Sequence, residues 1–276
     1  FYAVIAVYFV RIYLMRGRAE AIADKTPLTS EDKRAILRRK IFKSAYITII
    51  VSLLLTGGLF FYFRGDKNLS VTYLDVGQGD ASVTELPDNK IIVNDTGKNG
   101  REVSAFLKYI GRKDIDALVL SHADNDHAGG AGYLIEKFNV REIWDNGRLI
   151  YPSGVFSGIR RRALERGDFV EGKGYRIYLL HPYKEFYTGD ERNEDNNGSL
   201  VLRIEGKERS FLFTGDIAEE AEENIAYLGK WLKSDVIKVP HHGGRTSADQ
   251  FFFDLVSPQI AVISAGRGNS FGHPHQ

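Results

Sequence analysis

Uncharged, apolar residues fill two stretches near the start of the chain. Residues 44–63 carry no charged side chain, and 20 such residues match a helix that crosses the ~30 Å hydrocarbon layer of a membrane. A buried core helix is the alternative, but such helices are usually shorter. Residues 1–10 are also apolar. The pattern predicts a transmembrane helix over 44–63 and the end of an earlier, truncated span over 1–15.

The segment 16–43 between these stretches is basic. Residues 1–69 hold 12 basic and 5 acidic side chains, whereas residues 70–276 hold 25 basic and 31 acidic ones. Segments rich in Lys and Arg tend to stay on the cytoplasmic side of membrane helices. We therefore expect a cytoplasmic linker over 16–43, with a capped surface helix at 33–42. Everything after residue 64 is then expected on the extracytoplasmic side of a multi-pass protein of the cell membrane.

Short strands and helices alternate from residue 69 onwards. Strands are expected over 71–76, 81–86, 90–94, 115–120, 141–144, 175–180, 199–205, 208–213, 235–239 and 259–264. Helices are expected over 101–110, 129–138, 155–166, 217–229 and 247–256. Each half of this region has a run of strands followed by strand–helix units. This order predicts an α/β fold over 69–276, in which two packed sheets are covered by helices in four layers.

Composition limits the chemistry. Hydrophobic residues make up 43% of the chain, which excludes wholesale disorder. The chain has no Cys, which excludes a disulfide framework and any thiolate ligand or nucleophile. A metal site in this protein must therefore use nitrogen and oxygen ligands.

Histidine occurs mostly in close pairs. Six of the seven His residues form three groups, and the seventh, His181, stands alone before Pro182 and is expected to be a loop residue. The groups are His122 with His127, His241 with His242, and His273 with His275.

The densest group of potential metal ligands follows the apolar run 115–120. His122, Asp124, Asp126 and His127 lie within six residues of one another, at the carboxyl end of a predicted strand, where α/β folds place ligand sites. Imidazole and carboxylate groups bind first-row divalent metals. The next helix begins directly afterwards, and its N-terminal amides favour an anion such as phosphate. The pattern predicts a metal site beside an anion site.

This loop resembles the signature of the metallo-β-lactamase superfamily, usually His-x-His-x-Asp-His. Three further motifs agree with it, namely Asn94-Asp95-Thr96-Gly97, Phe213-Thr214-Gly215-Asp216 and Val239-Pro240-His241-His242-Gly243-Gly244. The resemblance covers about residues 69–276. It implies a four-layer αββα metallo-β-lactamase-like sandwich with hydrolase activity, preceded by the transmembrane helix.

A narrower resemblance is to the hydrolase-like domain of ComEC-type competence proteins, which are DNA-uptake channels. The motifs that carry it are Tyr73-Leu74-Asp75-Val76-Gly77-Gln78-Gly79-Asp80-Ala81, residues 196–202 (NNGSLVL) and Gly272-His273-Pro274-His275. It implies a metal-dependent nuclease that degrades the non-transported DNA strand during natural transformation. The implied partners are DNA, the rest of a multi-span channel and a competence DNA receptor. Relatives usually continue with a further helix, so a chain extended beyond Gln276 is expected to be more stable.

The resemblance also implies a ligand set for two divalent metal ions. His122, Asp124 and Asp216 would hold one ion, and Asp126, His127, Asp216 and one of His241 and His242 would hold the other. Asp124 stands where many relatives have His, and oxygen ligands favour Mn²⁺ over Zn²⁺. Asn197 stands near another ligand position of the relatives. An amide is a poor ligand, so one of the two ions would be bound more weakly. Asp95 would orient the ligand loop from outside the ligand set, as would Asn197.

Catalysis is expected from Asp126, Asp216 and His273. His273 or His275 could donate a proton to the leaving oxygen or contact phosphate. Arg160, Arg161 and Arg162, on the predicted helix 155–166, are either a DNA-phosphate contact or a solvated face. The turn Gly77-Gln78-Gly79-Asp80 has two interpretations. It only joins two strands, or it also borders the site.

Two other functions fit the same motifs. One is a phosphodiesterase that acts on a cell-envelope polymer, such as a phosphorylcholine ester. The other is a module that guides DNA without cutting it.

Overall fold

The computed structural model describes residues 29–63, 68–150, 154, 156–186 and 194–275. The chain divides into two compact units, Phe1–Gly65 and Asp66–Gln276, which are described separately. The expected span over 1–15, residues 16–28 of the expected linker and residues 187–193 lie outside the described residues.

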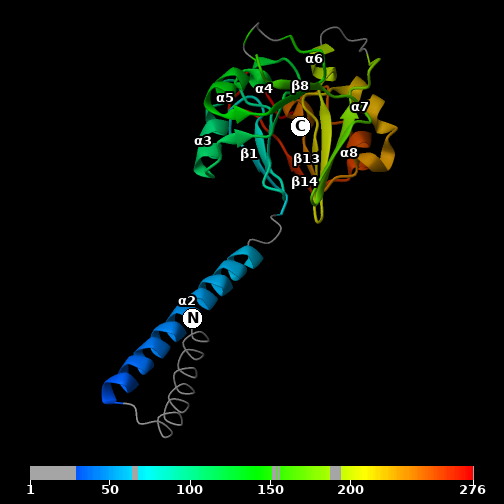
Figure 1. Ribbon diagram of the computed structural model, residues 1–276. Helices are drawn as coiled ribbons and strands as arrows, with labels where there is room; N and C mark the ends of the chain where they lie inside the picture. Colours follow the sequence, from blue (N-terminus) through cyan, green and yellow to red (C-terminus); the bar gives the residue numbers. More distant parts are fainter. Residues whose placement is uncertain (1–28, 64–67, 151–153, 155, 187–193, 276) are drawn as a thin grey trace. The chain divides into compact units, whose positions relative to one another are not determined.

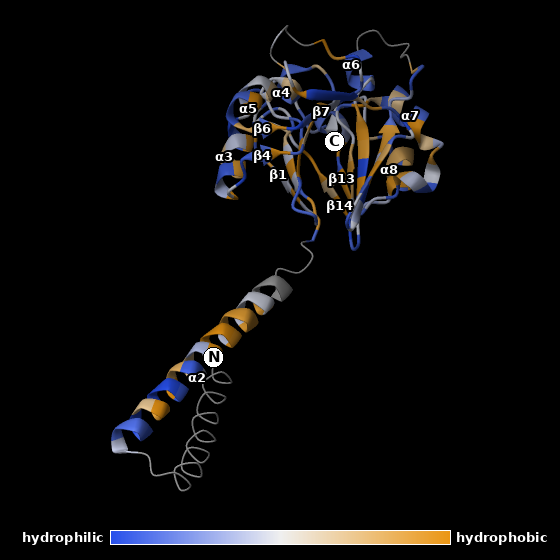
Figure 2. Cartoon of the chain, in the orientation of Figure 1, coloured by the Kyte–Doolittle hydropathy of each residue, from blue (hydrophilic) through white to orange (hydrophobic). Residues whose placement is uncertain are grey.

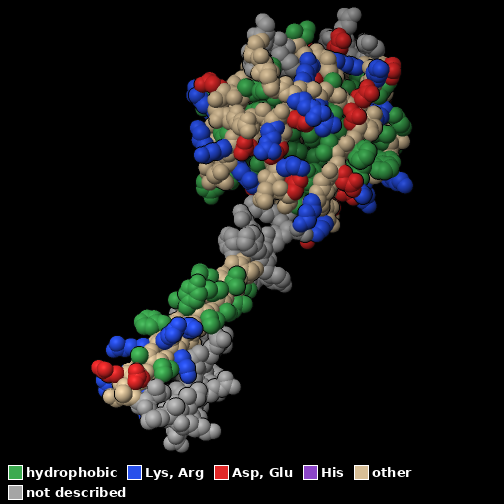
Figure 3. Space-filling model, viewed as in Figure 1, with side chains coloured by type: hydrophobic (Ala, Val, Ile, Leu, Met, Phe, Trp, Pro, Cys, Tyr) green, Lys and Arg blue, Asp and Glu red, His purple; other side chains and the backbone are tan. Residues whose placement is uncertain are grey.

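A single long helix, α2 (Ser30–Phe63), makes up the described part of the first unit. Thr29 caps it, since the Thr29 Oγ1 atom accepts a hydrogen bond from the Asp32 backbone N–H at 3.2 Å. The expected surface helix at 33–42 is therefore not a separate element, because it continues without a break into the apolar segment. Charged side chains occupy the first half of α2 and apolar side chains the second half (Figures 2 and 3).

The range Ser30–Leu59 is, within the described residues, the one helix long and apolar enough to cross a membrane. Its most apolar window has a mean hydropathy of 1.6, and only 6% of that window is buried. A core helix of a soluble protein would be mostly buried. The apolar surface of α2 thus agrees with the expected transmembrane segment by length and composition.

The second unit contains two six-stranded sheets and a two-stranded one. The first sheet has the order β1-β2-β3-β5-β7-β8, and its strands are β1 (Ser70–Tyr73), β2 (Ser82–Glu85), β3 (Ile91–Asn94), β5 (Ala117–Val119), β7 (Glu142–Asp145) and β8 (Arg160–Ala163). The second has the order β14-β13-β12-β11-β10-β9, with β9 (Phe169–Gly172), β10 (Tyr175–His181), β11 (Val201–Gly206), β12 (Ser210–Phe213), β13 (Val236–Lys238) and β14 (Ile260–Val262). Strands β4 (Asp114–Ile115) and β6 (Asn139–Val140) pair separately.

Helices cover the outer face of each large sheet (Figure 1). On one side lie α3 (Arg101–Tyr109), α4 (Asn125–Ala128) and α5 (Ala131–Lys137); on the other lie α7 (Glu219–Ala226) and α8 (Gln250–Val256). A short helix, α6 (Glu194–Asn197), precedes β11, and 3-10 turns η2 (Gly229–Leu232) and η3 (Pro240–Gly243) flank β13. This arrangement confirms the four-layer αββα architecture.

Three apolar clusters hold these layers together. Strand β5 shows the alternation that creates them: Leu118 packs in the cluster under α3 and α5, whereas Ala117 and Val119 face the other sheet. The third cluster joins the second sheet to α7 and α8 through residues such as Ile237 and Phe252. Because both faces of each sheet are buried, the central strands read as nearly continuous apolar runs.

The predicted helix 155–166 is wrong. Residues 160–163 form the edge strand β8, which pairs in parallel with β7, so that Arg160 lies opposite Glu142 and Ala163 opposite Asp145. Gly154 and Gly158 have φ angles of 90° and 83° and interrupt any helix there. Pairing along the edge of a sheet therefore overrides a local pattern that favours a helix.

Candidate metal centre

The loop after β5 is fixed by hydrogen bonds to the loop after β3. Thr96 Oγ1 and the Thr96 backbone N–H each donate to the His127 carbonyl at 2.7 Å, and Gly130 N–H donates to Thr96 Oγ1 at 2.9 Å. Asp124 is the residue before α4, and its carbonyl accepts from the backbone of His127 at 2.9 Å. The four predicted ligands of this loop therefore lie on a short turn that these hydrogen bonds hold in place.

His127 is oriented by Asp95. The Asp95 Oδ2 atom lies 2.9 Å from His127 Nδ1, and the Ser121 backbone N–H and hydroxyl both donate to the same carboxylate at 2.8 Å. Asp95 is buried and has a positive φ of 55°. With Nδ1 held in this way, His127 presents Nε2 to the site.

His242, rather than His241, faces the site. Both residues have left-handed backbone angles, with φ of 47° and 55°, and their side chains diverge. His242 is buried, and its Nδ1 donates to the Ser264 carbonyl at 2.7 Å. Its Nε2 lies 3.4 Å from His127 Nε2. His241 is half-buried, and its ring centroid lies 5.7 Å from that of His273.

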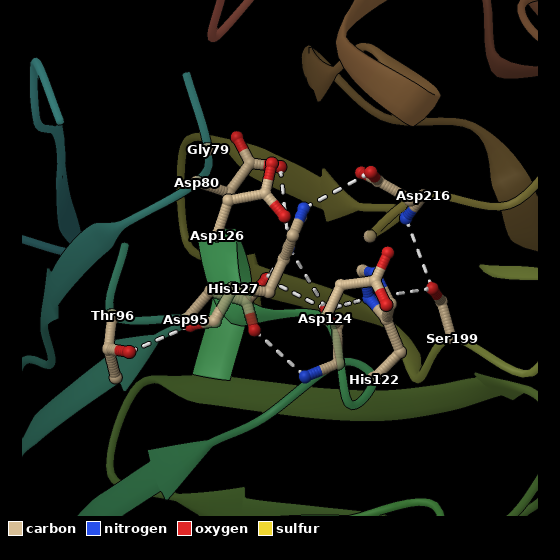
Figure 4. A network of polar contacts seen from close by, with 12 residues as sticks. Gly79, Asp80, Asp95, Thr96, His122, Asp124, Asp126, His127, Ser199 and Asp216 are labelled. Atoms are coloured by element: carbon tan, nitrogen blue, oxygen red, sulfur yellow. Dashed lines mark hydrogen bonds and ion pairs between the residues drawn. The ribbon is translucent and has the colours of Figure 1, made fainter. Parts of the chain in front are cut away.

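Asp216 closes this corner of the site. It follows β12, and its Oδ2 atom lies 3.1 Å from the Nε2 atoms of both His127 and His242. Its backbone N–H donates to Ser199 Oγ at 3.1 Å (Figure 4). Asp126 lies on the more open side, with Oδ2 at 3.6 Å from His242 Nε2.

Four buried residues, Asp80, His127, Asp216 and His242, offer ligand atoms within 4.8 Å of one another and could hold a metal ion. The nitrogen spacing fits this use, because two nitrogens bound tetrahedrally at ~2.0–2.1 Å from one ion lie about 3.3–3.4 Å apart. The set of imidazoles and carboxylates suits first-row divalent metals. These residues therefore fit a divalent metal ion.

Sequence reasoning missed Asp80 as a site residue. From the sequence, the turn before Asp80 is expected either to join two strands only or also to border the site, and Asp80 is not among the expected ligands. Gly79 has a φ of 136°, and a Cβ atom there would overlap the Asp126 carbonyl, so glycine lets this turn lie directly against the ligand loop. The Asp80 backbone N–H then donates to the Asp126 carbonyl at 3.1 Å.

The second missed residue is Lys238, whose buried ammonium group contacts Asp80 and Asp216. A charged residue at the end of the otherwise apolar strand β13 was the available signal. An apolar strand position with a charge usually requires a buried partner.

Two further predicted ligands, His122 and Asp124, lie beside the group formed by His127, His242 and Asp216. His122 Nδ1 lies 3.0 Å from Ser121 Oγ and 3.3 Å from Ser199 Oγ, and its Nε2 lies 3.6 Å from Asp124 Oδ2. His122 Nε2 is buried and has no hydrogen-bond partner among the described residues. The Asp124 side chain is half exposed. Figure 4 shows both residues beside the carboxylates of the site.

Asn197 is the last residue of α6 and contacts Ala218 and His181. Its Oδ1 atom accepts from the Ala218 backbone N–H at 2.9 Å, and its carbonyl lies 2.7 Å from His181 Nε2. The expectation of a loop position for His181 is wrong, since His181 ends β10 and is fully buried. Burial lowers the pKa of His181 to about 3, so this imidazole is neutral.

The other pair of histidines lies at the border of the site. The His273 ring centroid is 6.0 Å from that of His242 and 5.3 Å from that of His275. The His275 backbone N–H donates to the Gly243 carbonyl at 2.9 Å. Burial, and the neighbouring imidazoles, lower the pKa of His273.

Charges within the centre shift several pKa values. Burial opposes protonation of His127, but Asp216 and Asp95 outweigh it and raise its pKa well above the usual range. Burial likewise opposes protonation of His242, whereas hydrogen bonds to Asp126 and Asp216 raise its pKa to about 9. Burial alone would raise the pKa of Asp216, but His127 and Lys238 hold it well below its usual range. A metal ion that binds here must displace protons from imidazole.

The three arginines expected to contact DNA lie on β8 rather than on a helix. Arg161 Nε donates to Asp145 Oδ2 at 2.6 Å, and Arg160 NH1 lies 3.1 Å from Glu142 Oε1. Arg162 lies over the Trp144 ring at 5.3 Å. Strand β7 separates β8 from β5, so these side chains are not part of the metal centre.

Comparisons with known proteins agree with this geometry. The family model described as "Metallo-beta-lactamase superfamily" matches residues 74–267. ComE operon protein 3 of Bacillus subtilis (strain 168) is 31% identical over 81% of this chain and 33% of its own length. Competence protein ComA of Neisseria gonorrhoeae is 32% identical over 76% of this chain and 29% of its own length.

A shorter match is to Exodeoxyribonuclease WalJ of Streptococcus pneumoniae (strain D39), 33% identical over 64 residues, which are 22% of this chain and 23% of that protein. This chain spans about a third of the length of ComE operon protein 3 and of competence protein ComA.

Proposed function

Because the chain belongs to the metallo-beta-lactamase superfamily, we propose that its second unit is a metal-dependent nuclease domain. It would hydrolyse phosphodiester bonds of the non-transported strand as a channel takes up DNA during natural transformation. The observation that carries this proposal is the convergence of His127 Nε2, His242 Nε2 and Asp216 Oδ2 within 3.1–3.4 Å. Such a group suits a hydrolytic metal rather than a structural one, because the side chains of Asp126 and Asp124 on one side of it are partly exposed to solvent.

Two groups of residues would hold divalent metal. His127, His242, Asp216 and Asp126 would form one group, and His122 with Asp124 would form the other, which Asp216 would also join. When bound, divalent metal lowers the pKa of water and stabilises negative charge on phosphate oxygens. The oxygen-rich set that includes Asp124 and Asp126 favours Mn²⁺ over Zn²⁺.

The chain's own groups then position the substrate and move protons. Asp95 keeps the His127 ring in one orientation. Asp126 is partly exposed, with 24% of its side chain accessible, and can accept a proton from attacking water. His273 is partly exposed at the border of the site and could donate a proton to the leaving oxygen.

DNA contacts are proposed at the segment 264–275, which closes over the turn before Asp80. The Ser264 hydroxyl donates to the Gly79 carbonyl at 2.7 Å, and the Gly266 backbone N–H donates to Gln78 Oε1 at 3.1 Å. Arg267, in this segment, is exposed, as is Arg245, whose Nε donates to His275 Nδ1 at 3.3 Å. The exposed Phe271 ring stacks on His273 with centroids 5.6 Å apart, and aromatic rings beside cations suit single-stranded nucleic acid.

Arg160, Arg161 and Arg162 remain a second proposed DNA contact. The register of β8 with β7 places Arg160 beside the first residue of β7, whereas the metal ligands follow the carboxyl end of the parallel strand β5. A DNA strand that touches both must therefore extend along the edge of the first sheet.

The names of the relatives support the substrate class. Competence protein ComA and Exodeoxyribonuclease WalJ carry names that refer to competence and to DNA cleavage. For the whole protein we propose a multi-pass position in the cell membrane, with the nuclease on the extracytoplasmic side, next to the rest of the channel and a DNA receptor. The basic first half of α2 supports this orientation.

The test is hydrolysis of labelled single-stranded DNA and of a phosphorylcholine ester by the purified chain, with and without Mn²⁺. Metal-dependent cleavage of DNA alone supports the nuclease. Ester cleavage alone would indicate an envelope phosphodiesterase, and DNA binding without cleavage would indicate a guiding module.

A second experiment tests on which side of the membrane the domain lies. A single Cys in place of exposed Tyr109 provides the label site, since this chain has no other Cys. An impermeant maleimide should label it from outside, and labelling only after lysis would contradict the orientation.

A further inference from the structure

A buried lysine lies beneath the metal centre. Lys238 is the last residue of β13, is 4% exposed, and has its ammonium group enclosed by acceptors. Nζ contacts Asp80 Oδ2, lies 3.2 Å from Asp216 Oδ1, and donates to the Gly215 carbonyl at 3.0 Å. A charged amine this deeply buried is tolerated only with such partners.

Lys238 divides the two oxygens of Asp216 between different tasks. Oδ1 is bound to the ammonium group, whereas Oδ2 lies 3.1 Å from both His127 Nε2 and His242 Nε2. The carboxylate can therefore offer only Oδ2 to an ion held by these imidazoles.

Asp80 faces the wrong nitrogens to share that ion. Its Oδ2 lies 3.8 Å from His127 Nδ1 and 4.0 Å from His242 Nδ1. Those Nδ1 atoms are already bound, one to Asp95 and the other to the Ser264 carbonyl. Asp126 instead lies near His242 Nε2, at 3.6 Å, on the side where both imidazoles present their free nitrogens.

We infer that Lys238 is a positioning residue that keeps Asp80 out of the metal's ligand set. Its fixed positive charge stands between Asp80 and Asp216, where a cation would otherwise neutralise the two carboxylates. A bound ion would consequently be held by His127, His242, Asp216 Oδ2 and Asp126. This inference rests on the proposed metal centre but not on DNA as the substrate.

Removal of the ammonium group should create a new cation site. In Lys238→Met, Asp80 and Asp216 Oδ1 lose their shared positive partner and repel each other. A divalent ion between them would relieve this repulsion. The side chain of Met has a similar length and lacks charge, so the variant changes the electrostatics with little change in volume.

The experiment is calorimetric titration of the full, metal-free chain with Mn²⁺ alone. Asp126→Asn should weaken the tightest site at least tenfold, whereas Asp80→Asn, the matched carboxylate-to-amide change, should alter it less than threefold. Lys238→Met should bind one more Mn²⁺ per chain than the unmodified protein, and Lys238→Met/Asp80→Asn should lose that extra ion.

Equal weakening by Asp80→Asn and Asp126→Asn would overturn the inference, as would an unchanged stoichiometry in folded Lys238→Met. If Lys238→Met does not fold, the comparison of Asp80→Asn with Asp126→Asn still decides. Binding of Mn²⁺ without any DNA cleavage would refute the proposed nuclease and leave this inference standing. Absence of Mn²⁺ binding by the unmodified chain would refute both.

Discussion

Asp95 Oδ2 and His127 Nδ1 lie 2.9 Å apart, and this contact joins the loops after two neighbouring parallel strands, β3 and β5. It holds the imidazole so that Nε2 points at Asp216 and His242. Asp95 thereby determines which nitrogen of His127 would face a metal ion bound at this site.

Replacement of Asp95 by Ala should therefore lower metal affinity by about 10–100-fold, the usual effect of removing a carboxylate that orients a ligating histidine. Isothermal titration with Mn²⁺ measures this. Asp88→Ala, a carboxylate bonded to Lys90 away from the centre, is the control and should leave affinity unchanged. Unchanged affinity in Asp95→Ala would show that the His127 ring is held in some other way.

The adjacent histidines provide a matched pair. His242→Ala should abolish tight metal binding because its Nε2 is one of the converging nitrogens, whereas His241→Ala should retain it because that ring faces His273. Metal content after purification in Mn²⁺ distinguishes them. Equal losses in the two variants would contradict the assignment of His242.

Two arginines of β8 should have different effects when replaced: Arg161 should affect stability, and Arg160 should affect DNA binding. Arg161→Ala removes the bidentate partner of fully buried Asp145 and should cost about 1–3 kcal/mol of unfolding free energy. Arg160 is 73% exposed at its side chain, so Arg160→Ala should leave the melting temperature unchanged. If this cluster binds DNA, Arg160→Ala should reduce the salt dependence of binding by about one unit; an unchanged slope would leave the segment 264–275 as the proposed contact.

Glu222 should make the domain less stable as pH rises. It accepts hydrogen bonds from the backbone of Ala248 and Asp249, and burial raises its pKa from 4.5 to about 7. The folded state thus binds this proton more tightly than the unfolded state, so the stabilisation is complete below pH 4.5 and is lost as pH rises to about 7. Melting temperatures at pH 5 and pH 8 should differ less in Glu222→Gln than in the unmodified protein; equal differences would contradict this account.

The core of the site could be predicted from sequence because its signals are local. An apolar strand followed by His122, Asp124, Asp126 and His127 places four potential ligands at one sheet edge without further information. Asp216, which follows β12, was instead implied by the resemblance of Phe213-Thr214-Gly215-Asp216 to a family motif. The choice between His241 and His242 needed the backbone angles that turn one ring inward.

What could not be predicted depends on contacts between distant segments. Asp80 lies in the loop between β1 and β2 of the first sheet, whereas Lys238 ends β13 of the second sheet, and the two meet only in the fold. Edge pairing with β7 made a strand of the arginine-rich residues 160–163. His181 is buried because α6 folds back and offers it the Asn197 carbonyl, which its position before Pro182 did not indicate.

Asp216 is proposed to hold metal for phosphodiester hydrolysis, and cleavage of end-labelled single-stranded DNA by Asp216→Ala tests this role most directly. In Mn²⁺ the unmodified chain should cut DNA and a chelator should stop it. Asp216→Ala should show less bound metal, an intact fold by circular dichroism, and cleavage no faster than the chelated protein. Cleavage by Asp216→Ala at the unmodified rate would contradict the metal-nuclease account.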